Sequence, residues 1–187
     1  IDRTGAGGGG AGGQSRHMRG QNLLVARRLV ESGVPFVNVY DFRQQGQNWD
    51  SHANNFSQHK DILLPAADRG LAALIGDLEE RGLLDTTLIV ATGEFGRTPQ
   101  INSNAGRDHW TNCYGSLLAG AGIRGGTVYG ASDSQAAYVK DRPVSTSDVC
   151  CTVYQALGID PGMTVPDPTG RPVPIAHGGQ PIFEILS

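Results

Sequence analysis

Three short clusters in the middle of the chain hold the side chains best suited to chemistry. The first contains Asp50 and His52, the second contains Glu94, and the third contains the neighbours Asp108 and His109. Carboxylates and imidazoles bind divalent cations and transfer protons in enzymes. If the fold brings these clusters to one edge of a sheet, they form a candidate metal or proton-transfer site.

The first two clusters each have a structural alternative. In a turn, the Asp50 carboxylate can accept backbone N–H groups while His52 is merely exposed. Glu94 follows an apolar run and has Gly93 and Gly96 as near neighbours. A carboxylate at the end of a buried strand needs a metal or an ion-pair partner, and Arg97 is a candidate partner. Both interpretations of each cluster therefore stay open. In the functional interpretation Glu94 is a ligand or catalyst, and in the structural one it forms an ion pair with Arg97.

Adjacent residues of an extended segment point to opposite sides, so only one of the third pair is expected to enter the site directly. We expect this to be His109, with Asp108 either a second ligand or a group that orients an imidazole. Arg97 and Arg107 would be available to hold an anionic oxygen, because a guanidinium group matches phosphate or sulfate. His17, His59 and His177 read as surface residues.

Apolar periodicity predicts the elements that carry these clusters. A helix over residues 20–32 should end at Gly33, and a β-rich run over 34–40 reads as a strand. The polar segment 41–56 then carries Asp50 and His52 at the carboxyl end of that strand, which is where sites form in open α/β sheets.

A second, longer helix should begin with Ser57 as its cap and end at Gly82, with a kink or break near Pro65. The continuous apolar run at 86–91 predicts a buried parallel strand that leads into Glu94. Further along, residues 116–120 read as a strand, and Ser145 with Asp148 forms a capping-box variant for a helix that Gly158 ends. Residues 182–186 fit either a strand or a short helix.

Composition limits the classes of function. The 187 residues suffice for one domain with a real core, and the net charge of −3 gives no general attraction for nucleic acid or anionic membranes. No apolar run approaches the roughly 20 residues of a membrane-spanning helix. The three cysteines, Cys113, Cys150 and Cys151, lack CxxC spacing and are expected to be buried free thiols.

The first nineteen residues differ from the rest. Gly-rich sequence predicts a flexible segment over 1–19, followed by one domain over 20–187. Because Ile1 is not a methionine, we expect the chain to be a fragment or a processed product.

Four runs resemble the DUF1501 family, and they occur in the order WDSHANNF (49–56), LLDTTLIV (83–90), GEFGRTP (93–99) and GRDHW (106–110). The family is uncharacterised, common in planctomycetes and grouped with the alkaline phosphatase and sulfatase superfamily. The resemblance covers roughly residues 20–187 and leaves out the Gly-rich start. It implies an alkaline-phosphatase-like α/β fold, with a mostly parallel sheet flanked by helices, of which this chain would be the carboxyl half.

The resemblance also implies roles for particular residues. Asp50 and His52 correspond to the superfamily's Asp and His before the long helix, and His109 corresponds to its last His. Glu94 and Phe95 stand where the superfamily has an Asp-His pair, and Phe95 cannot coordinate a metal. The superfamily's nucleophile and first metal-binding Asp lie in an N-terminal half that resembles nothing in this chain.

The function expected from the resemblance is a metal-dependent hydrolase that acts on a small anionic phosphate or sulfate ester. Asp50, His52, Asp108 and His109 would be metal ligands, with Glu94 a ligand or base and Arg97 or Arg107 an anion contact. Zinc, calcium, magnesium and manganese all stay open.

Two alternatives stay open beside this function. One is a binding or structural module that keeps the fold without the chemistry. The other is one part of a larger assembly, in which a partner chain supplies the missing half. The resemblance also suggests an exported, periplasmic or extracellular protein.

Overall fold

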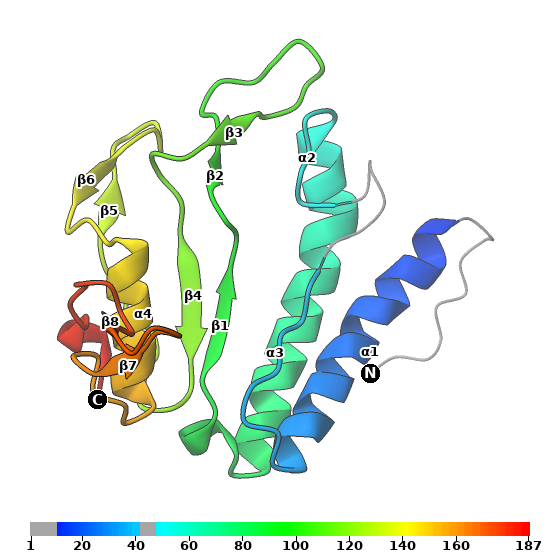
Figure 1. Ribbon diagram of the computed structural model, residues 1–187. Helices are drawn as coiled ribbons and strands as arrows, with labels where there is room; N and C mark the ends of the chain where they lie inside the picture. Colours follow the sequence, from blue (N-terminus) through cyan, green and yellow to red (C-terminus); the bar gives the residue numbers. More distant parts are fainter. Residues whose placement is uncertain (1–10, 42–47) are drawn as a thin grey trace. The chain divides into compact units, whose positions relative to one another are not determined.

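The computed structural model describes residues 11–41 and 48–187, and the side chains of residues 11–19 lie outside this description. The chain divides into two compact units. One comprises Ile1–Leu83 and Arg97–Trp110, and the other comprises Leu84–Gly96 and Thr111–Ser187. Each unit has its own helices and short strands (Figure 1).

Two long helices lie side by side in the first unit (Figure 1). They are α1 (Ala11–Glu31) and α3 (Leu64–Glu80). The helices approach closely at Gly70, where an added Cβ would lie 3.0 Å from Leu23 Cδ1. Leu78 of α3 is 2% exposed and contributes to the small apolar core.

A network of charges reinforces the contact between these helices. Arg27 of α1 is 7% exposed, and its Nε lies 2.6 Å from Asp77 Oδ2 on α3. Arg27 also pairs with Glu31, and Arg81 pairs with Glu31 and Asp77 at 3.0 and 2.8 Å. Because each charge has two opposite partners, the buried guanidinium group is compensated.

The helix that follows the first cluster is continuous but irregular. It consists of α2 (Asn55–Ser57), the π-helical turn η1 (Gln58–Leu63) and α3. A kink or break was predicted near Pro65; the structure has a π-helical turn just before this proline, and the helix continues through it. Ser57 is not the cap, since the helix begins after Asn54, which adopts a left-handed conformation with φ of 49°.

A glycine lies just after the end of each long helix. α1 ends before Gly33, with φ of 88°, and α3 ends before Gly82, with φ of 65°, as predicted. The start of α1 differs from the prediction, because the helix begins at Ala11 rather than near residue 20. The predicted flexible segment 1–19 therefore overlaps this helix over 11–19, and residues 1–10 lie outside the described residues.

The strand predicted over residues 34–40 is wrong. Residues 35–41 have no regular secondary structure, and Phe36 and Tyr40 are 82% and 77% exposed. A β-rich run becomes a strand only when another strand accepts its hydrogen bonds. No strand among the described residues pairs with this run.

The second unit contains a pair of strands that are not consecutive in the sequence, β1 (Ile89–Thr92) and β4 (Ser116–Ala119). The pair is antiparallel, with Ile89 opposite Ala119 and Thr92 opposite Ser116. The strand predicted at 116–120 is thus confirmed, whereas the parallel pairing predicted for 86–91 is wrong. A 3-10 turn, η2 (Leu84–Thr86), precedes β1.

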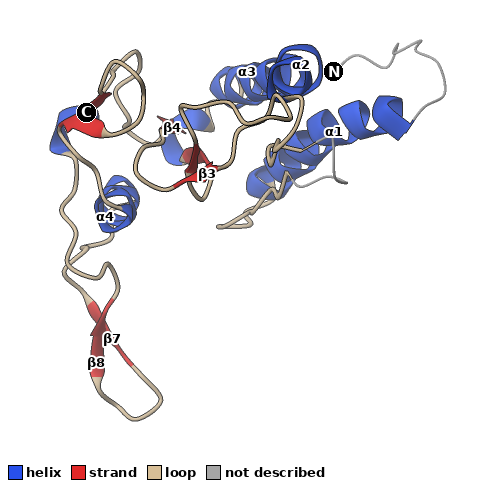
Figure 2. Ribbon diagram, turned by 90° about the horizontal axis from the view of Figure 1, so that it is seen from above, coloured by secondary structure: helices blue, strands red, loops and turns tan. Residues whose placement is uncertain are grey.

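The other strands are short and pair two by two, and the registers defined for two of these pairs are antiparallel. They are β2 (Gly96–Arg97) with β3 (His109–Trp110), β5 (Ala131–Ser132) with β6 (Val139–Asp141), and β7 (Thr164–Pro166) with β8 (Pro172–Pro174). Within the second unit, the β7–β8 hairpin extends away from α4 (Figure 2). The mostly parallel sheet is not found among the described strands, and the alkaline-phosphatase-like fold stays a prediction.

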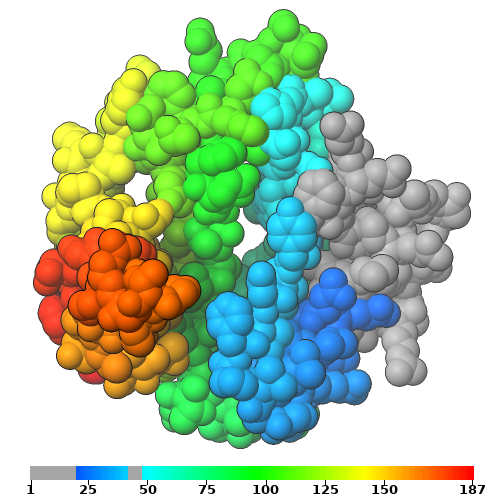
Figure 3. All heavy atoms as spheres, viewed as in Figure 1, coloured from blue at the N-terminus to red at the C-terminus, as the bar shows by residue number. Residues whose placement is uncertain are grey.

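Helix α4 (Thr146–Ala156) holds the C-terminal residues in place. Its capping box is as predicted: the Ser145 Oγ accepts from Asp148 N at 3.1 Å, and the Asp148 carboxylate accepts from Ser145 N at 2.8 Å. The buried Thr152 hydroxyl accepts from Ile182 N at 2.9 Å. The chain then ends in a 3-10 turn, η3 (Phe183–Ile185), and Figure 3 shows the segments after α4 in orange and red.

All three cysteines are free, as predicted. Only Cys151 is buried, however, because Cys150 on the same helix is exposed and Cys113 is intermediate. Among the described residues, no helix has the length and apolar character that crossing a membrane requires.

Candidate metal centre

Two loops of the first unit carry the predicted site residues. The loop before α2 begins at the buried Asn48, whose Oδ1 accepts from Asp50 N at 2.9 Å and closes a turn. Trp49 anchors the same loop through a hydrogen bond of 2.8 Å from Nε1 to Asp41 Oδ2. The turn leaves Asp50 and His52 exposed on one side and buries Ser51, which lies between them.

The second loop, residues 98–108, lies along the first and is joined to it by main-chain hydrogen bonds. Asn54 N donates to Asn104 O at 3.0 Å, and Arg107 N donates to Ser51 O at 3.2 Å. The pairing is so close that a Cβ on Gly106 would fall 1.9 Å from His52 O. The two loops therefore hold Asp108 and His109 against the first cluster.

Three donor atoms converge where the loops meet. Asp50 Oδ1 lies 3.0 Å from His52 Nε2 and 2.9 Å from His109 Nε2, and the two Nε2 atoms are 3.1 Å apart. In the described part of the chain, no other set of three His, Cys, Asp or Glu residues brings its donor atoms within 4.8 Å of one another. Asp50 and His52 thus meet His109 across a separation of nearly sixty residues.

A second carboxylate contacts the His52 ring on the nitrogen that faces away from Asp50. Asp108 Oδ1 lies 2.7 Å from His52 Nδ1, and this contact lowers the pKa of Asp108, so the ionised carboxylate accepts from an Nδ1–H group. With the single N–H of an imidazole on Nδ1, the His52 Nε2 lone pair faces the Asp50 carboxylate and can bind a cation.

The geometry fits a small divalent cation. Ligand atoms about 2.0–2.1 Å from a tetrahedral zinc ion are about 3.3 Å from one another. The observed separations of 2.9–3.1 Å need to grow by only a few tenths of an ångström. Two imidazoles and one carboxylate are a donor set that zinc accepts in catalytic sites.

The two predicted anion contacts differ in their surroundings. Arg97 Nη2 donates to Asp50 Oδ1 at 2.6 Å, and the bonds from His109 and Arg97 hold the pKa of Asp50 at about 2. Arg107 instead donates from Nη1 to Thr98 O and Pro99 O at 2.5 and 2.7 Å. Arg107 therefore supports the second loop, and Arg97 is the guanidinium group at the cluster.

Asp108 and Glu94 are placed differently from the three converging residues. Asp108 contacts His52 at Nδ1, the ring nitrogen that faces away from Asp50 and His109. It therefore orients that imidazole, which is one of the two roles considered for Asp108. Glu94 belongs to the second unit, in the bend after β1, and is exposed. Its role as a ligand or base stays a prediction.

Sequence reasoning missed a buried polar group behind the cluster. Ser51 is 1% exposed, its Oγ lies 3.0 Å from His59 Nε2, and Asn55 Nδ2 donates to it at 2.5 Å. Burial and the charge of Arg97 lower the pKa of His59, whose ring also packs edge-on against Trp49. His59, predicted to be a surface residue, is intermediate in exposure. His177 is exposed as predicted, and the side chain of His17 lies outside the described residues.

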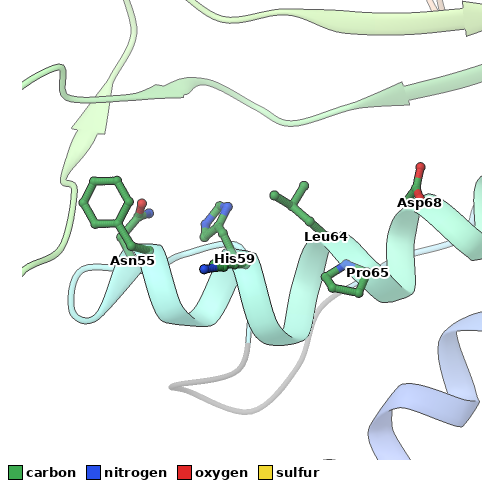
Figure 4. Close-up of a pocket in the computed structure, with 7 residues that line it drawn as sticks. Asn55, His59, Leu64, Pro65 and Asp68 are labelled. Atoms are coloured by element: carbon green, nitrogen blue, oxygen red, sulfur yellow. The ribbon is translucent and has the colours of Figure 1, made fainter.

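A shallow cavity of about 690 Å³ follows the irregular helix. Figure 4 shows Asn55, His59 and Leu64 along one side of that helix. Phe56, a further lining residue, lies under the Arg107 guanidinium group, whose Cζ is 5.6 Å from the ring centroid. The cavity thus shares His59 and Asn55 with the polar group behind the cluster.

The described residues form helices and small two-stranded sheets, and they carry a candidate His-His-Asp metal centre. A family model described as a protein of unknown function, DUF1501, matches residues 4–186, and the chain belongs to this family. The match includes the Gly-rich start from residue 4, so the expectation that the resemblance begins near residue 20 is wrong. No curated protein and no solved structure matches the chain.

Proposed function

We propose that the chain binds a divalent cation through Asp50, His52 and His109 and serves as a metal-dependent hydrolase of phosphate or sulfate esters. The observation that carries the proposal is the convergence of three donor atoms within 3.1 Å of one another. The nitrogen-rich donor set favours zinc over calcium, magnesium or manganese. The ester chemistry rests on the resemblance to the alkaline phosphatase and sulfatase superfamily.

Each residue of the site has a distinct task in this proposal. Asp50, His52 and His109 hold the cation, which when bound polarises the ester oxygen and stabilises the charge of the transition state. Asp108 fixes the orientation of the His52 ring. Arg97 places a positive charge beside Asp50, where a small anionic ester would be attracted.

One sequence feature favours a second candidate, a binding or structural module without chemistry. Phe95 stands where the superfamily resemblance calls for a histidine ligand, and a phenyl ring cannot coordinate a metal. In this case the chain would keep the fold without hydrolysing an ester. A third arrangement, in which another chain completes the site, predicts a native mass larger than that of one chain.

Metal content and ester hydrolysis separate these functions. The purified protein should retain about one equivalent of zinc per chain after gel filtration and should hydrolyse p-nitrophenyl phosphate or p-nitrophenyl sulfate. His109→Ala should lose both properties. His177→Asn is the matched control, because His177 is exposed and its φ of 46° is one that asparagine tolerates.

The outcomes are distinct. Bound metal without turnover of either ester supports the module, and a native mass above 19.7 kDa supports an assembly. Failure to bind zinc, calcium, magnesium or manganese at micromolar concentration contradicts the proposed metal centre.

A further inference from the structure

Asn102 uses its whole hydrogen-bonding capacity at the junction of the two loops. Its Oδ1 accepts from Asn104 N at 3.0 Å and from Gly106 N at 2.9 Å. Its Nδ2 donates to His52 O at 3.0 Å and to Asp108 Oδ1 at 3.1 Å. An amide carries two donor hydrogens and one acceptor oxygen. If the side-chain amide were flipped, its NH2 group would face the two backbone N–H groups, and its oxygen would face the His52 carbonyl and the Asp108 carboxylate.

Two of these contacts reach the same metal-binding residue by different routes. The bond to His52 O fixes the backbone of that residue. The bond to Asp108 Oδ1 fixes the carboxylate that in turn accepts from His52 Nδ1 at 2.7 Å. The position of the His52 ring and its rotation about Cβ–Cγ are therefore both tied to one amide group.

We propose that Asn102 is a positioning residue that sets the affinity of the Asp50, His52 and His109 centre for its cation. The inference rests on the proposed function. Asn102 touches neither cation nor substrate and acts through Asp108 and the His52 backbone.

The choice of asparagine follows from the partners. An aspartate at this position would still accept from Asn104 N and Gly106 N, but it would donate to neither His52 O nor Asp108. It would also place two carboxylates about 3 Å apart, which is unfavourable for both ionised groups. The main-chain bonds between the loops, from Asn54 N and from Arg107 N, remain in either case.

The loops should therefore fold without the Asn102 amide, while the His52 ring loses its fixed orientation. Removing a group that orients a metal ligand commonly weakens metal binding about 10–100-fold. We expect a weakening in this range for Asn102→Ala and for Asn102→Asp.

The experiment measures zinc dissociation constants by competition with a chromophoric chelator, for the full chain and its variants. About 0.5 M NaCl shortens the screening length to roughly 4 Å, so the charge added in Asn102→Asp cannot mask the effect. Asn104→Ala is the control, because only the backbone of Asn104 takes part in the contacts described. Urea unfolding of each metal-free variant reports stability separately.

A double-mutant cycle with Asp108→Ala distinguishes positioning from general loosening. If Asn102 acts through Asp108, most of the loss caused by Asn102→Ala should disappear when Asp108 is already absent. Additive losses would contradict action through Asp108. Should Asn102→Ala fail to fold, Asn102→Asp, which keeps the acceptor oxygen, supplies the same measurement.

Failure of this inference differs from failure of the proposed function. Zinc binding by the wild type, together with unchanged affinity in both Asn102 variants, overturns the positioning role and leaves the metal centre intact. Absence of zinc binding in the wild type overturns both.

Discussion

Replacing Asp50 with asparagine should destabilise the metal-free protein in a way that depends on pH. The bonds to His109 and Arg97 hold the pKa of Asp50 at about 2, compared with 3.8 for an unperturbed carboxyl group. At roughly 1.36 kcal/mol per pH unit, this difference corresponds to about 2.4 kcal/mol. Because the side chain is 49% exposed, solvent screening reduces the contribution to about 1 kcal/mol.

The sign of the pH dependence follows from the direction of the pKa change. A carboxylate whose pKa is lower in the folded state stabilises the protein fully above its unfolded pKa, and this stabilisation is lost as pH falls toward the folded pKa. Asp50→Asn should therefore unfold about 1 kcal/mol more easily at pH 7. The difference from wild type should shrink between pH 4 and pH 2.

Urea unfolding followed by circular dichroism in EDTA at pH 7, 5 and 3 measures this difference. Asp68→Asn is the control, since Asp68 is an exposed carboxylate on α3. Saturating zinc adds a second test, because a ligand at about 100 times its dissociation constant stabilises the folded state by roughly 2.7 kcal/mol. An Asp50→Asn variant equal to wild type at pH 7 in EDTA, and equally stabilised by zinc, would refute the reasoning.

Two buried hydroxyl groups give further predictions. Thr152→Val keeps the side-chain shape but leaves Ile182 N without its partner, and it should lower the free energy of unfolding in urea by about 1–3 kcal/mol. Thr152→Ser keeps the hydrogen bond and should lower it by about 1 kcal/mol or less. Ser51→Ala removes the acceptor for the Asn55 amide and the contact with His59. It should lower the free energy of unfolding by about 1–2 kcal/mol. A loss below about 0.5 kcal/mol would contradict a structural role for the Ser51 hydroxyl.

Local signals predicted the helix ends correctly. Gly33 and Gly82 adopt positive φ after α1 and α3, and Ser145 with Asp148 closes the capping box of α4. Each of these features depends on a few neighbouring residues, so the sequence alone is sufficient. The convergence of Asp50 with His109 also followed from residue types, although only the tertiary pairing of the loops brings the atoms within 2.9 Å.

Pairing partners could not be predicted in the same way. The apolar run that ends at Thr92 fits a buried parallel strand, but its neighbour is Ser116–Ala119, which runs in the opposite direction. Strand direction depends on which segment lies alongside, and composition does not encode this. The role of Asn102 could not be predicted for the same reason. Its contact with His52 spans fifty residues, and its neighbours in the sequence are typical of an ordinary polar turn.

The closeness of the two loops makes Gly106 the residue on which the whole centre depends sterically. A Cβ at this position would lie 1.9 Å from His52 O, 2.0 Å from His52 C and 2.5 Å from Ala53 N. Since these are backbone atoms, no side-chain rotation relieves the overlap. In Gly106→Ala the loops must separate, which lengthens the bond from Arg107 N to Ser51 O and moves His109 away from His52.

We therefore expect Gly106→Ala to weaken zinc binding at least about tenfold, because an error of about 1 Å in ligand placement is enough to disable a site. Gly115→Ala is the matched control, since a Cβ at Gly115 meets nothing within 4 Å. Equal zinc affinities of the two variants, in proteins that remain folded by circular dichroism, would show that the cation does not bind where the loops meet. Loss of affinity in Gly106→Ala alone ties the cation to this junction, because the substitution alters none of the proposed ligands and changes only the distance between the segments that carry them.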